Sequence, residues 1–187
     1  DKLAAFSGFG FPKSHAAAFG LLAYQSAWLR HHYPAEFLCA LLNAQPMGFY
    51  PPSSLVRDAQ RRGVEVRPPD VNLSGVRCTW EEGAVRLGLE YVKSVGKDDA
   101  ETLVAEREAN GAYVDIGDLA RRVPLDAREL EALLRSGACD RWGKRRDLLW
   151  ELGLVSRPLT VRREHKQLTL SLEPTAATPD LPHLTAW

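Results

Sequence analysis

Apolar side chains recur along this chain with two different periods. Spacings of three and four residues, which place side chains on one face of a helix, predict helices at 14–33, 34–45, 54–63, 90–95, 98–108, 115–123, 126–137 and 144–152. Residues 64–68, 76–80 and 84–89 alternate between apolar and polar as strands do, and Gly83 predicts a tight turn between two of these strands. The pattern predicts a mainly α protein with a small antiparallel β element.

Local residues indicate where several of these helices begin and end. The helix at 14–33 is rich in Ala and Leu, so we expect it to be mostly buried. Pro34 ends that helix and can occupy the first turn of the next one. We expect Ser53 or Ser54 to cap the third helix, and Gly63 to end it in the left-handed conformation.

Residues 89–138 can be divided into two helix-turn-helix units of similar length. The turn of the first unit contains Gly96 and Lys97, which raises the question of a nucleotide-binding loop. Such a P-loop requires an earlier glycine and a Ser or Thr directly after the lysine, whereas this chain has Asp98 there. A P-loop is therefore excluded.

Two interpretations of this first turn remain open. It is either a plain turn or a hairpin that presents Gly96 and the amides of the following helix to a DNA phosphate, with Lys97 adding positive charge. Ser94 replaces the first glycine of the strict hairpin pattern, and the carboxylates of Asp98 and Asp99 would repel a phosphate.

The turn of the second unit points to a structural role. Pro124 lies in this turn and removes an amide that a phosphate would need. Asp126 is followed three residues later by Glu129, which is the arrangement of a helix capping box. We expect this unit to brace the first one.

Composition limits the kinds of function that the chain can have. With 187 residues, of which 45% are hydrophobic, it can form a substantial core. The 24 basic residues balance the 24 acidic ones, so any nucleic-acid contact must be local. No segment resembles a membrane span or a leader, and we expect a cytoplasmic piece of a longer protein.

Candidate chemistry is confined to local groups of charged residues. Two basic clusters could neutralise phosphates, although such runs are more often solvated surfaces: Arg57, Arg61, Arg62 and Arg67, and then Arg141, Lys144, Arg145 and Arg146. Cys39, Cys78 and Cys139 have no metal-ligand spacing and are expected to be free thiols, and His31 and His32 to be a surface pair at a helix end. No catalytic grouping and no metal site are predicted in this chain.

Several stretches together resemble the C-family DNA polymerases of bacteria, in the order in which that family has them. They are "GFPKSHAAAF", "YQSAWLRHHYPAEF" and "ALLN", followed by "GVEVRPPDVN", "VRLGLEYVKSVG" and "LLRSGACDRWGKRRDLLW". "LLNAQPMGFY" is more similar to the error-prone, translesion branch than to the main replicase. The resemblance extends over about residues 1–153.

The resemblance implies a domain organisation. Residues 1–63 would be the C-terminal part of the fingers, 64–88 a small β-hairpin element, and 89–153 a tandem helix-hairpin-helix module that binds DNA. Residues 154–187 would be a Pro-rich linker toward an OB domain, with 167–172 as a possible edge strand.

The resemblance also implies roles for individual residues and partners. Lys13, Ser14 and His15 would lie near the incoming nucleotide, and Gly96 and Lys97 would contact the backbone of the primer-template duplex. Phosphoryl transfer would use Mg²⁺ and palm aspartates outside this chain, so the fragment alone is expected to be inactive. The alternative is a protein-interaction module that docks a sliding clamp or a mutasome accessory protein, for which "QLTLSL" is a weak peptide match.

Overall fold

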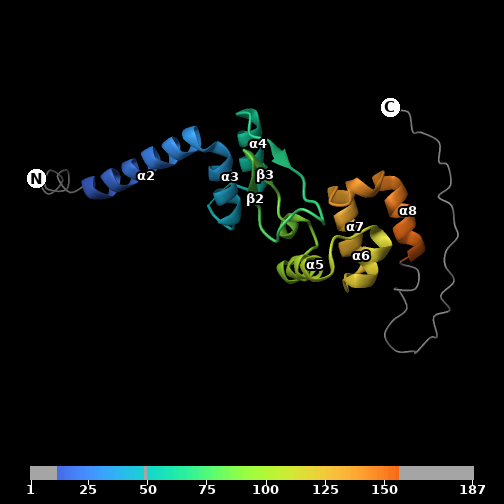
Figure 1. The fold of residues 1–187 in the computed structure, drawn as a ribbon. Helices are drawn as coiled ribbons and strands as arrows, with labels where there is room; N and C mark the ends of the chain where they lie inside the picture. Colours follow the sequence, from blue (N-terminus) through green and yellow to red (C-terminus); the bar gives the residue numbers. More distant parts are fainter. Residues whose placement is uncertain (1–11, 49, 156–187) are drawn as a thin grey trace, which may run out of the picture. The chain divides into compact units, whose positions relative to one another are not determined.

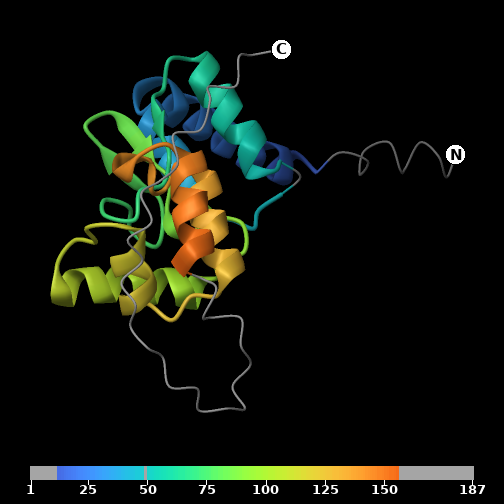
Figure 2. The same ribbon diagram turned by 90° about the vertical axis from the view of Figure 1, so that its right-hand side faces the viewer.

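A computed structural model describes residues 12–48 and 50–155 of the chain (Figures 1 and 2). Its α-helices in these ranges are α2 (Lys13–His32), α3 (Pro34–Asn43), α4 (Pro52–Arg61), α5 (Lys97–Asn110), α6 (Ile116–Arg122), α7 (Ala127–Ser136) and α8 (Arg145–Val155). The described residues also form two 3-10 helices, η1 (Leu89–Tyr91) and η2 (Asp140–Trp142), and a three-stranded sheet. The predicted mainly α class is confirmed. The proposed linker and the stretch 167–172 lie outside the described residues.

The chain divides into two compact units. Unit 1 consists of Asp1–Val66 and Trp80–Val85, and unit 2 consists of Arg67–Thr79 and Arg86–Trp187. The chain therefore passes between the units more than once, and each unit contains segments that are separated in the sequence.

The small sheet contains β1 (Val66–Arg67), β2 (Thr79–Glu81) and β3 (Ala84–Arg86) in the order β1-β3-β2. β2 and β3 form a hairpin through Glu82 and Gly83, which have φ values of 51° and 84°, as expected for a tight turn. On the other side of β3, Val85 N–H donates to Glu65 O and Leu87 N–H donates to Arg67 O. The donor and the acceptor residue both move two positions forward from the first of these bonds to the second, so β1 and β3 are parallel. The sheet is therefore mixed and not wholly antiparallel as predicted. The long connection between β1 and β2 returns the chain to the same end of the sheet.

In unit 1, α3 supplies more buried side chains than any other described element. Pro34 occupies its first turn, as predicted, and Leu38 and Leu42 are among the buried residues on its inner face. α2, in contrast, has no buried residue, and Phe19 and Trp28 are 58% and 44% exposed. The prediction of a mostly buried helix was wrong. α2 is long and its apolar residues are spread around the axis, so its packing against α3 cannot cover them all.

Helix α4 shows how proline changes the expected start of a helix. Pro51 is the N-cap residue and Pro52 begins the helix, so neither Ser53 nor Ser54 is the cap. Pro lacks an amide hydrogen and has a helical φ, which makes it well suited to the first turn. Gly63 follows the C-cap with a φ of +88°, so the predicted helix end is confirmed.

Unit 2 is built around one core formed by residues from η1, α5, α6, α7 and α8. Leu103 in α5, Leu119 in α6 and Leu130 in α7 are fully buried there. α8 packs against both α6 and α7. The helix predicted at 90–95 was wrong: only the 3-10 turn η1 forms, because Ser94 adopts a φ of +74°, which no α-helix allows.

Candidate nucleic-acid interface

The turn between η1 and α5 is a tight hairpin. Val95 N–H donates to Val92 O at 3.0 Å, and Ser94 has a φ of +74° at the third position of this turn. A positive φ at that position is typical of a type II turn, where glycine is preferred. Gly96 itself has an extended backbone with φ −76° and is the N-cap residue of α5. The conformation that favours glycine is therefore at Ser94.

The N-terminus of α5 presents several backbone donors. Gly96 N–H is already bonded to Asp99 Oδ2 at 3.0 Å, as in a capping box. The amides of Lys97, Asp98 and Asp99 have no acceptor among the described residues, because the helical ladder begins with Ala100 N–H donating to Gly96 O. These donors and the positive end of the helix dipole favour an anion at this end.

Lys97 lies in the first turn of the same helix. Its Nζ is 3.5 Å from Glu101 Oε1, and both side chains are more than half exposed. Exposed pairs of this kind contribute little free energy. The Lys97 ammonium group can therefore exchange this carboxylate for a phosphate at small cost.

Hydrogen bonds from neighbouring segments fix α5 in place. Arg107 in α5 donates to Val71 O at 2.9 Å and to Ser74 O at 2.8 Å. Asn72 donates to Tyr113 O and accepts from Tyr113 N–H, so residues 70–74 are attached to the segment after α5. The Tyr113 hydroxyl donates to Leu103 O, and burial raises the pKa of Tyr113 to about 12. These contacts hold the hairpin at a fixed position within unit 2.

The helix that follows the turn at Pro124 is α7, and amide donors at its N-terminus are already hydrogen-bonded within the protein. Asp126 Oδ1 accepts from the amides of Arg128 and Glu129, and Glu129 Oε2 accepts from Asp126 N–H. The predicted capping box is confirmed. Two carboxylates occupy the positions where a phosphate would bind, which agrees with a bracing role.

The turn between α7 and α8 is a further glycine turn that the sequence interpretation did not identify. Gly137 ends α7 in the left-handed conformation with φ +90°. Arg145 closes the turn, with Nε 2.8 Å from Asp140 Oδ1 and Nη2 2.7 Å from Asp140 Oδ2. This hydrogen bonding lowers the pKa of Asp140. The only signal in the sequence was Gly137 directly after a periodic helix.

All four cations of the second basic cluster are exposed, but three of them have carboxylate partners. Arg145 is largely committed to Asp140, and Arg141 Nη1 is 4.0 Å from Asp70 Oδ1. Arg146 Nε lies 3.3 Å from Asp147 Oδ1. Lys144 is exposed and has no ion pair within residues 12–48 and 50–155.

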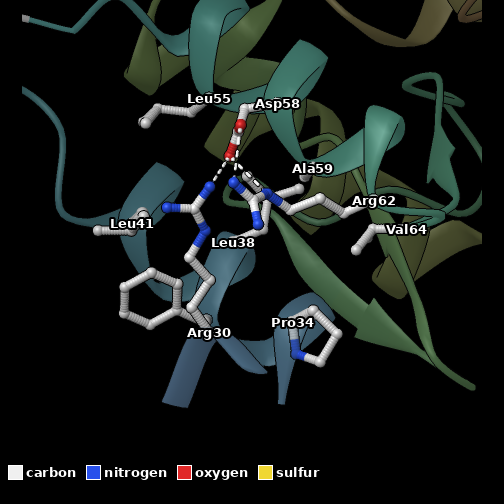
Figure 3. A pocket seen from close by; sticks show the side chains of 10 residues that line it. Arg30, Pro34, Leu38, Leu41, Leu55, Asp58, Ala59, Arg62 and Val64 are labelled. Carbon is white, nitrogen blue, oxygen red and sulfur yellow. Dashed lines mark hydrogen bonds and ion pairs between the residues drawn. The ribbon is translucent and has the colours of Figure 1, made fainter. Parts of the chain in front are cut away.

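The first basic cluster belongs to unit 1, apart from Arg67, which lies at the start of unit 2. Arg62 donates to Asp58, which also accepts from Arg30 of α2, at the rim of a small apolar cavity (Figure 3). The hydrogen bond from Arg62 is the main cause that lowers the pKa of Asp58. Arg57 and Arg61 are exposed.

Lys13, Ser14 and His15 form the exposed first turn of α2. Pro12 is the N-cap residue, and the first ladder bond runs from Ala16 N–H to Pro12 O. The His15 ring packs against Phe19, with ring centroids 4.4 Å apart. The structure thus brings the three predicted residues together at one helix N-terminus.

Other kinds of site find no support in the described part of the chain. It holds no group of His, Cys, Asp and Glu residues that could bind a metal ion, and no helix there has both the length and the apolar character of a membrane span. All three cysteines are buried and none of them forms a disulfide within the described residues, and burial raises the pKa of Cys139 to about 12. His31 and His32 are exposed neighbours in the last turn of α2, as expected.

Comparison with known proteins places these observations in a family context. A family model described as "Helix-hairpin-helix motif" matches residues 63–149. Proteins named error-prone DNA polymerase are similar to this chain. The one from Corynebacterium efficiens is 48% identical over 157 residues, which cover 83% of this chain and 14% of that protein. For Mycobacterium tuberculosis the identity is 51% over 159 residues, with coverages of 83% and 14%. For Nocardia farcinica it is 44% over 197 residues, with coverages of 100% and 17%. The chain thus spans less than a fifth of the length of these relatives, and the predicted resemblance is confirmed.

Proposed function

We propose that this chain, which is homologous to one segment of the error-prone DNA polymerases, positions template, incoming nucleotide and product duplex in such an enzyme during translesion synthesis. Unit 2 would contact the product duplex through the hairpin before α5. Unit 1 would contribute the surface near the incoming nucleotide, through Lys13, Ser14 and His15.

The observation that carries this proposal is the set of unpaired donors at the start of α5. Three successive amides, those of Lys97, Asp98 and Asp99, have no acceptor in the described chain, and Lys97 adds a weakly paired positive charge. Backbone amides and lysine recognise phosphate oxygens in any sequence. Such contacts suit a polymerase, which must hold product DNA irrespective of its bases.

Catalysis is assigned to other parts of the parent enzyme. We expect its nucleotidyl transfer to use Mg²⁺ held by palm aspartates outside this chain, and the described residues of this chain offer no acidic cluster for the ion. The chain alone is therefore expected to be inactive. Its role in the cytoplasmic parent would be binding and orientation, with a sliding clamp or mutasome accessory protein as further partners.

Duplex binding by the 187-residue chain tests the proposal. Fluorescence anisotropy with labelled duplexes of different sequence, at two salt concentrations, should show binding with a clear salt dependence. Lys97→Glu should weaken binding about tenfold at low salt, to a similar extent for every sequence, because it replaces a phosphate contact with a repulsion.

Arg121→Glu provides the matched control. Arg121 is a 72% exposed cation on α6, and the variant changes the net charge by the same amount. A general effect of charge would lower affinity equally in both variants. If Lys97→Glu binds no more weakly than Arg121→Glu, the hairpin is not the DNA contact. A wild-type chain that binds no duplex at low salt would refute the proposed function.

A further inference from the structure

A groove lies between the hairpin turn and α7. It has a volume of about 500 Å³ and is lined by residues of the turn, Lys93 and Ser94, and by residues of α7 that include Arg128, Glu131 and Arg135. All of them belong to unit 2, and the hairpin forms one wall of the groove. The turn and α7 are far apart in the sequence, so the groove exists only in the folded module.

The charge in this groove is mainly positive and partly unpaired. The side chains of Lys93 and Arg128 are exposed and have no acidic partner within the described residues. Arg135 is bound to Glu131, with Nη2 2.7 Å from Oε1, and this exposed pair is open to exchange. Among the described residues, Glu131 is the one acidic residue that lines the groove.

Two of the cations that line the groove, Arg128 and Arg135, belong to α7. Arg128 and Arg135 are seven residues apart and share one face of the helix, separated by about 10 Å along its axis. Both side chains can therefore contact phosphates of the same DNA strand. Lys93 adds a third cation beside this face.

We infer that this groove binds the backbone phosphates of one strand of the duplex, with Lys93 and Arg128 as direct contacts and Arg135 joining them when it exchanges Glu131 for phosphate. The inference rests on the proposed function and adds a second contact surface to the amides of α5. Contacts of this kind are made by side chains to phosphates and do not depend on the base sequence. Glu131 limits the affinity, because its carboxylate competes with phosphate for Arg135.

Salt titrations of duplex binding test this inference on the 187-residue chain. Lys93→Ala and Arg128→Ala should each lower the affinity several-fold at low salt and reduce the slope of log K against log salt by about 0.9, the value for one phosphate contact. Arg121→Ala removes an equal charge outside the groove and should change the slope much less. Circular dichroism should show unchanged helical content, because all these side chains are exposed.

The variant Glu131→Gln should bind the duplex more tightly than wild type, a change that partial unfolding would not produce. Removing one negative charge about 4 Å from a phosphate should raise the affinity about fivefold at low salt, and the gain should shrink at high salt. If Lys93→Ala and Arg128→Ala bind like Arg121→Ala, or Glu131→Gln binds no more tightly than wild type, the groove is not a DNA contact. A continued loss of binding in Lys97→Glu would then show that the hairpin proposal still stands.

Discussion

Replacing Ser94 by glycine should stabilise unit 2. Ser94 has a φ of +74°, and the left-handed conformation costs an L-residue about 1–2 kcal/mol. Glycine adopts this φ freely but loses about 0.5–1 kcal/mol more in conformational entropy on folding. The side chain of Ser94 is exposed and has no hydrogen-bond partner within the described residues, so Ser94→Gly removes no hydrogen bond. The expected net gain is about 0.5–1 kcal/mol, which raises the Tm of a unit of roughly 60–100 residues by about 2–8 °C.

Thermal unfolding followed by circular dichroism, together with a urea titration, measures this gain. Ser94→Ala is the first control, because it removes the hydroxyl and keeps the unfavourable φ. Gly96→Ala is the second control: Gly96 has a φ of −76°, so alanine fits the backbone there, although its Cβ would lie 3.0 Å from Asp99 Oδ2. We expect little change in Ser94→Ala and a small loss in Gly96→Ala. A Ser94→Ala variant as stable as Ser94→Gly, or a destabilised Ser94→Gly, would refute the backbone explanation.

Two further predictions concern the turn between α7 and α8. Gly137→Ala should destabilise the protein by about 2 kcal/mol in a urea titration, because it combines left-handed strain with a displaced ion pair: its Cβ would lie 2.5 Å from Arg145 Nη2. This loss should be less than additive with that of Arg145→Ala, and additive losses would contradict the proposed clash. Asp140 has a lowered pKa in the folded state, chiefly through its hydrogen bond from Arg145, so its stabilising contribution is present above its ordinary value of 3.8 and is lost as the pH falls. Asp140→Asn should be less stable than wild type at pH 7 and should lose less stability on acidification, and parallel curves of urea midpoint against pH would exclude this role of Asp140.

Much of the fold followed from local chemistry. The capping box at Asp126 and Glu129, the left-handed Gly63 and the turn at Gly83 each depend on residues within a few positions, and the structure has all of them. The burial of α2 could not be predicted in the same way, because burial depends on neighbours in space and not on composition. The helix predicted at 90–95 failed because residues of ordinary helical propensity do not reveal the left-handed φ of Ser94.

The sequence predicted only those parts of the candidate interface that are formed by residues close together in the chain. The hairpin with Gly96 and Lys97 is visible in the sequence, but the bond between Asp99 and Gly96 N–H requires the folded turn. The groove that joins Lys93 to Arg128 was beyond sequence reasoning, because 35 positions separate these cations along the chain. Arg145 shows the opposite case: a cation that looks available in the sequence is held by Asp140.

The attachment of residues 70–74 to α5 limits how this module can be transplanted. Val71 is fully buried in the core of unit 2, and its carbonyl oxygen accepts from Arg107. A graft that begins at Leu89 would leave a cavity at Val71 and unpaired donors on Arg107 and Tyr113, each with an energetic penalty. Protein engineers who move this helix-hairpin-helix module into another protein should therefore transfer the segment from Arg67 onward together with the helices.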